Sequence, residues 1–261
     1  MQTATDVWLK ALEDTKYNYE YECEPRNQKI KEILNYNYET PLEFPIVTHM
    51  GRNLNYAFMY GEAAWILSGR NDADFIMQYM KSYHRFSDDG FTLNGAYGPK
   101  LIEQVSWAAN ELANDNDSRR CYINIWRERP GPSKDIPCTT GIQFIIRDGK
   151  LNALVNMRSQ DVVWGMPYDI FTFSAIAKYM QVFLWQIKNV AVGLGKLAVR
   201  VGSLHLYEHH FEDAGVWLGD KSTNNRDKSY SVACATTSPD KFIYNLISAA
   251  NKQRRPVNDN N

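Results

Sequence analysis

A two-residue turn at Asp148-Gly149 is the feature that most constrains how this chain of 261 residues folds. It separates two runs rich in β-branched and apolar residues, Ile142–Arg147 and Leu151–Met157. Both central positions of a type I′ turn need a positive φ angle, which Asp-Gly adopts readily, so the sequence predicts a β-hairpin. The segments just outside the hairpin, at Cys138 and Arg158, should therefore lie side by side.

The rest of the chain alternates between helical and extended patterns without an internal repeat. Helices are expected over residues 7–12, 54–65 and 75–83, with Asp72 as N-cap of the third, and over a long segment after Asp169. Further strands are expected over residues 122–126 and 197–207. Since 44% of the residues are hydrophobic, the chain can bury one large core. We therefore expect a single α+β domain of the α/β three-layer type over residues 1–261. Polar stretches at 220–228 and 254–261 should form a loop and a tail.

Charge and cysteine content exclude several classes of function. Twenty-nine basic and 30 acidic residues leave a net charge of -1, so no long-range field attracts nucleic acid or an anionic membrane. The four cysteines (Cys23, Cys121, Cys138 and Cys234) include no close pair of the metal or redox type, which favours a reducing cytoplasm. The N-terminus lacks a signal-peptide pattern, and no apolar run approaches the roughly 20 residues that cross a bilayer. We expect a cytoplasmic protein that binds neither nucleic acid nor membrane.

Chemistry-bearing residues gather at the outer end of the hairpin. Cys138 follows Pro137, and Arg158 opens the polar run 158–169. A thiol attacks as its thiolate, and a cation such as Arg158 can lower the thiol pKa below its usual value of about 8.5. Thiolate addition to C6 of a pyrimidine turns C5 into a carbon nucleophile, so this pair favours chemistry at pyrimidine C5. In isolation, a Pro-Cys dipeptide is more typical of a small buried side chain at the start of a strand.

Two further segments carry candidate polar groups. Glu62 lies beside the apolar stripe of its predicted helix, where burial would raise its pKa and make it a proton donor and acceptor near neutrality; a surface glutamate is the alternative. His205 and Tyr207 are two apart on an alternating strand and so share one face. A metal site remains an alternative there, disfavoured because the chain has no second ligand cluster; its ligands would be His205, His209, His210 and Asp213.

Several segments, in this order, resemble the motifs of the thymidylate synthase family across about residues 25–218. They are Phe44–Thr48, Gly61–Trp65, Ser118–Arg120, Pro137-Cys138, Arg158–Asp161, Gly165–Asp169 and Gly202–Tyr207. The resemblance implies a thymidylate synthase-like fold, with a large mixed β-sheet flanked by helices. It also implies a homodimer in which the sheets pack at the interface and the active sites are shared.

Within the family, Asn156–Ser159 and Asp169 are most similar to the deoxycytidylate hydroxymethylase branch of bacteriophages with modified cytosine. Thymidylate synthases carry asparagine at the position of Asp169, where the amide donates to O4 of uracil and accepts from N3-H. Cytosine reverses both demands, and a carboxyl group accepts from its N4 amine and, when protonated, donates to its N3. The alternative is that Asp169 only caps the helix that follows.

The resemblance also assigns the candidate site residues. Catalytic roles fall to Cys138, Glu62 and Asp169. Substrate binding falls to Arg26, Arg119, Arg120, Arg158, Ser159, Gln143, Gly165, Asp169, His205 and Tyr207. Arg119 and Arg120 would reach the phosphate from the partner subunit, and His205 and Tyr207 would contact a sugar hydroxyl. Contacts to the folate cosubstrate fall to Asp161, Trp65 and Tyr97, and no metal is implied.

The implied reaction transfers a one-carbon unit from 5,10-methylenetetrahydrofolate to C5 of dCMP through a Cys138–C6 adduct, and water then gives the 5-hydroxymethyl product. Water capture is favoured by Thr139 in place of the usual histidine, by the missing tryptophan segment near residues 82–90, and by the lack of the usual synthase ending. Alternatives are a dCMP methyltransferase that uses hydride, and a dUMP or CMP hydroxymethylase. A cytosine-5 DNA methyltransferase is disfavoured by the charge balance, and an inactive nucleotide- or RNA-binding homologue by the retained site residues.

Overall fold

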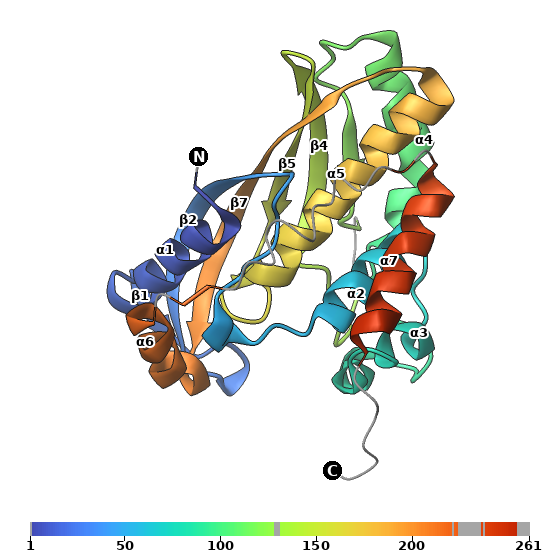
Figure 1. The fold of residues 1–261 in the computed structure, drawn as a ribbon. Helices are drawn as coiled ribbons and strands as arrows, with labels where there is room; N and C mark the ends of the chain where they lie inside the picture. The colour runs from blue at the N-terminus through green and yellow to red at the C-terminus, as the bar shows by residue number, and fades with distance from the viewer. Residues whose placement is uncertain (1, 128–130, 221, 224–235, 237, 255–261) are drawn as a thin grey trace.

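The computed structural model describes residues 2–127, 131–220, 222–223, 236 and 238–254 (Figure 1). Most of the predicted polar loop at 220–228 and of the tail at 254–261 lies outside these residues, as does Cys234.

Seven α-helices are described. They are α1 (Ala4–Tyr17), α2 (Tyr56–Leu67), α3 (Ala73–Met77), α4 (Gly98–Asn114), α5 (Met166–Lys188), α6 (Phe211–Gly219) and α7 (Pro239–Gln253). The four that the sequence predicted from apolar spacing correspond to α1, α2, α3 and the long α5. Short 3-10 segments are η1 (Pro25–Asn27), η2 (Met50–Arg52), η3 (Lys81–Phe86) and η4 (Glu208–His210).

The strands form one mixed sheet in the order β1-β2-β7-β5-β4-β3, with β6 paired to β7 off this path. They are β1 (Tyr21–Cys23), β2 (Ile30–Pro41), β3 (Tyr122–Asn124), β4 (Thr139–Arg147), β5 (Lys150–Met157), β6 (Gln160–Asp161) and β7 (Gly193–Tyr207). The β5–β7 and β6–β7 pairs are parallel and the others antiparallel. The expected large mixed sheet flanked by helices is confirmed; the single-domain organisation stays a prediction.

The predicted hairpin is confirmed. β4 and β5 pair in register through Arg147 and Lys150, and both turn residues have positive φ, 51° at Asp148 and 68° at Gly149. At the other end the backbone N–H of Arg158 donates to the carbonyl of Cys138 at 2.8 Å. Sequence positions 20 apart are thereby held next to each other.

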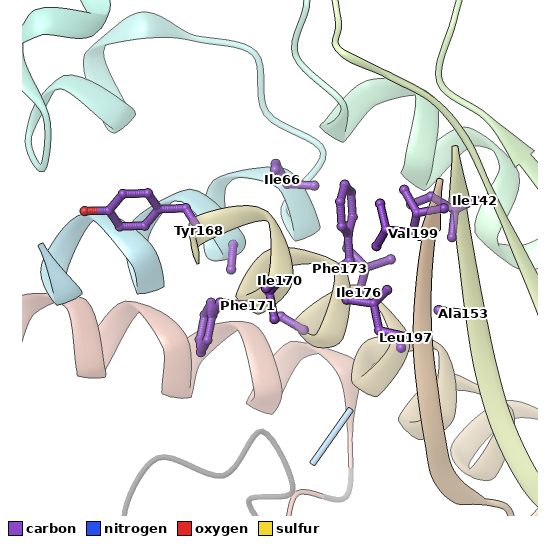
Figure 2. Close-up of a cluster of buried hydrophobic side chains, with 14 of the residues drawn as sticks. Ile66, Ile142, Ala153, Tyr168, Ile170, Phe171, Phe173, Ile176, Leu197 and Val199 are labelled. Carbon is purple, nitrogen blue, oxygen red and sulfur yellow. The ribbon is translucent and has the colours of Figure 1, made fainter. Parts of the chain in front are cut away.

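The core lies between α5 and the sheet. Figure 2 shows Phe173 and Ile176 of α5 facing Leu197 and Val199 of β7, with side chains of β4 and β5 beside them. All are buried, and removing apolar surface of this kind from water is the main favourable contribution to folding. The Gly165 N–H donates to the Asp161 carbonyl at 3.0 Å and joins the start of α5 to the end of β6.

One helix is shorter than its sequence pattern predicts. The run 75–83 forms α3 only as far as Met77, and Met80 is extended with φ -147° before the chain enters η3. The Tyr79 ring packs so closely on α2 that a Cβ on Gly61 would lie 2.5 Å from it. This contact, and that of Tyr83 with Glu62, override the local helical spacing. Asp72 does cap α3, its carboxylate accepting from the N–H of Phe75.

The described part of the chain contains no helix that is long and apolar enough to span a bilayer.

Candidate active site

A pocket opens where the N-terminal turn of α5 meets α2, η3 and the loop before β4. The predicted residues Glu62, Trp65, Tyr97, Cys138 and Asp169 all line it. They come from α2, the start of α4, the edge of β4 and α5, so the fold brings together positions that are far apart in the sequence. Their roles stay predictions.

Cys138 is placed by the hairpin and faces Arg158. Arg158 donates from Nε to the carbonyl of Pro137 at 3.0 Å and from Nη2 to that of Ile136 at 2.9 Å, and its Nη2 lies 3.7 Å from the Cys138 sulfur. Burial nevertheless raises the pKa of this thiol, and the Arg158 charge only partly offsets the effect. The expectation that Arg158 leaves the thiol with a lowered pKa is therefore wrong for the free protein. The nearby carboxyls of Asp169 and Asp135 add to the increase.

Asp169 lies in the first turn of α5 but does not cap it. The N-cap position is Gly165, whose carbonyl accepts the Asp169 N–H at 2.9 Å. The carboxylate instead accepts from Gln160 Nε2 at 2.8 Å through Oδ2. Burial raises the pKa of Asp169 to about 7. A carboxyl group that is neutral near physiological pH can donate a hydrogen bond as well as accept one.

Gly165 is required by close approach. A Cβ at this position would lie 2.9 Å from the carbonyl oxygen of Asp161 and 3.3 Å from Oδ2 of Asp169. The missing side chain lets the loop before α5 fold tightly over the buried carboxyl. The fold therefore requires glycine at position 165, whether or not Gly165 also binds substrate as predicted.

Glu62 faces the same pocket from α2. Its Oε1 accepts from the Tyr83 hydroxyl at 2.7 Å, and its Oε2 lies 3.5 Å from Oγ1 of Thr172. Burial raises the pKa of Glu62 to about 7, while both hydrogen bonds act to lower it. A carboxyl poised near neutrality can both give and take a proton, as the sequence predicted.

A second group of residues lies toward β7 and η1. His205 and Tyr207 project to one face of β7 with their rings edge to face at 5.0 Å, as expected. Burial lowers the pKa of His205. The Arg26 side chain bonds to the Tyr207 hydroxyl and, with the Arg158 charge, acts to lower the pKa of Cys138. Ser159, directly after Arg158, is half-buried.

The metal alternative finds no support among the described residues, in which no three potential ligands are grouped for a metal ion. His210 instead contacts the Asp213 carboxylate at 3.3 Å. His209 is exposed, as expected, whereas the His210 side chain is only 12% exposed and is less of a surface residue than the sequence indicated.

Of the predicted substrate-binding residues, only Asp169 lines the pocket itself. Arg119, Arg120 and Gln143 also lie apart from the second group of residues near β7 and η1. Arg119 and Arg120 are exposed in the turn after α4, and Arg120 donates to Glu111 at 2.8 Å. Gln143 lies on β4 and donates to the Arg119 carbonyl at 2.7 Å. Within a single chain these groups do not meet Cys138.

Of the three residues predicted to contact the folate cosubstrate, two line the pocket and one does not. Trp65 and Tyr97 line the pocket, with Trp65 Nε1 donating to the Asp72 carbonyl at 3.0 Å and the Tyr97 hydroxyl 3.0 Å from Oγ1 of Thr139. Asp161 does not line it, since its Oδ1 accepts the N–H groups of Val163 and Trp164 in the turn that leads into α5.

The structure also adds residues that the sequence did not single out for the site. Tyr83 binds Glu62, Gln160 binds Asp169, and Asp135 lines the pocket with a pKa raised by burial. Thr172 had a usable signal, because it follows Asp169 by three residues on an otherwise apolar helix face. Tyr83 had none, because its partner is 21 positions away and its ring suits the apolar stripe equally well.

Comparison with known proteins confirms the expected family, and the relatives that it finds are named for deoxyuridylate rather than deoxycytidylate. Residues 12–235 match the family described as thymidylate synthase. A deoxyuridylate hydroxymethyltransferase of Bacillus phage SP01 is 30% identical over 233 residues, which cover 81% of this chain and 57% of that protein. One of Pseudomonas phage M6 with the same name is 32% identical over 167 residues, covering 60% and 46%. The chain spans about half the length of these curated relatives.

Proposed function

We propose that this chain, which belongs to the thymidylate synthase family, transfers a one-carbon unit to C5 of a pyrimidine nucleoside monophosphate and that water completes the reaction as a 5-hydroxymethyl group. The preferred substrate is dCMP. One observation carries the proposal: the Cys138 thiol, the Glu62 carboxyl and the Asp169 carboxyl line one pocket.

Cys138 forms the first bond. Its sulfur adds to C6 of the ring, which shifts the electron pair of the C5–C6 double bond to C5. The thiol must lose its proton for this step, and Arg158 Nη2, 3.7 Å from the sulfur, stabilises the thiolate that results. Because burial raises the thiol pKa in the free protein, we place deprotonation after the nucleotide has bound.

Asp169 supports cytosine as the base. A neutral carboxyl group offers one acceptor and one donor, and these match the N4 amine and N3 of cytosine. Burial, which raises the pKa of Asp169 to about 7, makes that neutral form available at physiological pH. An unmatched polar group in such a site costs about 1–3 kcal/mol, enough to discriminate between bases.

A second candidate substrate is dUMP. Both relatives reported above are named as deoxyuridylate hydroxymethyltransferases. A neutral carboxyl also matches O4 and N3-H of uracil if the proton lies on its other oxygen. The choice between the bases therefore depends on which oxygen of Asp169 carries the proton.

The one-carbon donor is 5,10-methylenetetrahydrofolate, which supplies carbon at the oxidation level of formaldehyde. The pocket suits a flat heteroaromatic donor, because the rings of Trp65, Tyr83 and Phe86 line it beside polar groups. Trp65 and Tyr97 would contact the donor. Asp161 would do so only from the turn before α5, where one of its oxygens is already engaged.

Glu62 is the proposed acid and base for water capture. Tyr83 and Thr172 hold the two carboxyl oxygens in the pocket, and a pKa of about 7 allows Glu62 to take a proton from water as its oxygen adds to the C5 methylene. Before water adds, C5 bonds to the methylene carbon of the donor, and loss of the C5 proton with departure of tetrahydrofolate leaves an exocyclic methylene at C5. Addition of the water oxygen to that carbon returns an electron pair to the ring, and expulsion of the Cys138 sulfur from C6 restores the C5–C6 double bond.

We propose a homodimer with shared sites. The side chains of Gln143, Leu154 and Ala198 are neighbours across β4, β5 and β7, and they alternate with the buried Ile142, Val155 and Val199. They therefore project from the sheet face opposite to α5. Packing two such faces would bring the exposed Arg119 of one subunit toward the phosphate site of the other, which its own chain leaves to Arg26 and Arg158.

The test is incubation of the protein with labelled methylenetetrahydrofolate and dCMP, dUMP or CMP, with both products identified by mass. We expect 5-hydroxymethyl-dCMP and tetrahydrofolate. Dihydrofolate with a 5-methyl product would show hydride capture, a product from dUMP alone would reverse the base assignment, and no product with any nucleotide would refute the enzyme proposal.

A further inference from the structure

The Gln160 side chain is buried next to the base-reading carboxyl. It comes from β6, is 2% exposed, and places its Nε2 2.8 Å from Asp169 Oδ2 and 3.1 Å from the Tyr38 hydroxyl. The sulfur of Met157 is 3.3 Å from the same nitrogen. The amide is thus held by three neighbours on one side, and its position is set by packing rather than by solvent.

The contact with Oδ2 has a consequence for the proton of Asp169. An amide N–H needs an acceptor, so Gln160 stabilises the carboxyl when Oδ2 keeps its lone pairs and the proton lies on Oδ1. The reverse arrangement, with the proton on Oδ2, forces a donor against a hydroxyl that is a poor acceptor. In the low dielectric of this site such a mismatch is costly.

Base choice follows from the position of that proton. Cytosine needs an acceptor opposite its 4-position and a donor opposite N3, and uracil needs the opposite order. A neutral carboxyl with a free proton satisfies either base by moving the proton to its other oxygen. If the proton is confined to Oδ1, a base bound in a given orientation finds both hydrogen-bond partners when it is one of the two bases. The other base meets a donor facing a donor and an acceptor facing an acceptor.

We propose that Gln160 is a specificity-determining residue that fixes the proton of Asp169 on Oδ1 and so lets the site distinguish cytosine from uracil. The inference rests on the proposed function, since it concerns the base read by the same pocket. Gln160 is a positioning residue, because it acts on the base through Asp169.

The other ionisable groups around Asp169 do not supply this constraint. Glu62 on α2 and Asp161 on β6 act on it only as nearby charges, and Tyr38 on β2 is hydrogen-bonded to Gln160. Tyr97 at the start of α4 and Cys138 before β4 interact with it through their charges. Among the described residues, Gln160 is the one whose side chain forms a hydrogen bond with a carboxyl oxygen of Asp169.

Two variants test the inference. Gln160→Met keeps an unbranched side chain of similar size and removes the donor, and Gln160→Glu offers a donor only while the new carboxyl is protonated. Gln181→Met is the matched control. The Gln181 side chain also donates a partly buried hydrogen bond, to the Val192 carbonyl at 2.6 Å, but Gln181 lies twelve residues beyond Asp169 in the sequence. For each protein the dissociation constants of dCMP and dUMP are measured by calorimetry from pH 5.5 to 8.5, and the ratio of kcat/KM with folate present is measured alongside.

In Gln160→Met we expect the preference between the two bases to shrink by about tenfold, with Gln181→Met unchanged. In Gln160→Glu the preference should approach that of the natural protein at low pH and fall as the pH rises. A purely structural role would weaken both nucleotides alike and would not create this pH dependence. If the natural protein prefers one base and both Gln160 variants keep the same preference, the inference is overturned and the proposed function stands. If the natural protein binds neither nucleotide, the proposed function is overturned and the inference with it.

Discussion

The affinity for dCMP should fall as the pH rises above 7, because Asp169 must be neutral to donate to N3. Burial raises the pKa of Asp169 to about 7, well above the value of about 3.9 for an exposed aspartate. With that pKa, about nine tenths of the carboxyls are neutral at pH 6 and about one tenth at pH 8. The dissociation constant for dCMP should therefore rise by about tenfold per pH unit once the pH is well above 7.

The same shift affects stability, with a definite sign. Between about pH 4 and 7 the unfolded carboxyl is ionised while the folded one still holds its proton, so the folded state binds more protons. The free energy of unfolding should then fall as the pH rises through this window, by up to about 1.4 kcal/mol per pH unit from Asp169, and level off above 7. Glu62, whose pKa is also raised to about 7, should contribute in the same direction.

The variant Asp169→Asn distinguishes the contribution of Asp169 to the pH dependence from that of Glu62. An amide does not ionise, so for whichever base this variant binds, the part of the pH dependence due to Asp169 should disappear, leaving that of Glu62. The assays are calorimetric titration with nucleotide between pH 6.5 and 8.5 and urea unfolding between pH 4 and 8. If the natural protein and Asp169→Asn gave the same slopes in both, Asp169 would not be the titrating group and the cytosine argument would lose its basis.

The remaining predictions concern single contacts. Cys138→Ser should lower kcat by about 10³-fold or more while nucleotide affinity stays within a few-fold, measured by turnover and calorimetry. Tyr83→Phe removes the donor to Glu62, so kcat should fall by about tenfold and the pH profile should shift to higher pH, whereas an unchanged profile would exclude this contact from water capture. Gly165→Ala places a Cβ 2.9 Å from a backbone carbonyl and should cost about 1–3 kcal/mol in urea unfolding. Arg119→Ala alone should be inactive, and mixing it with Cys138→Ser subunits should restore roughly a quarter of the natural activity if sites are shared across a homodimer, whereas full activity of Arg119→Ala alone would contradict shared sites.

The sequence predicted the parts of the fold that have strong local signals. The Asp148-Gly149 turn and the apolar spacing of α5 specify their elements without help from distant contacts. β2 gave no such signal, because Ile30–Pro41 is rich in charged and amide residues of low strand propensity. It is a strand because eleven of its twelve residues pair with β7, which only the folded sheet can supply.

The site was predictable to a similar extent. Cys138 and Arg158 follow from the hairpin, whereas the direction of the thiol pKa depends on how much burial outweighs the nearby charge. Gln160 and Tyr83 acquire their meaning from partners that only tertiary packing brings near. Spacing alone cannot reveal such partners, because neither residue shares a helix turn or strand face with the carboxyl that it binds.

The central claim is that the Cys138 sulfur bonds to C6 of a pyrimidine. Its most direct test is to incubate the protein with 5-fluoro-dCMP and methylenetetrahydrofolate, since fluorine at C5 cannot leave as a proton does and the adduct should persist. We predict a complex of increased mass whose modified peptide contains Cys138, with no adduct in Cys138→Ser. A natural protein that turns over dCMP yet yields no adduct, or an adduct on Cys23 or Cys121, would contradict the account.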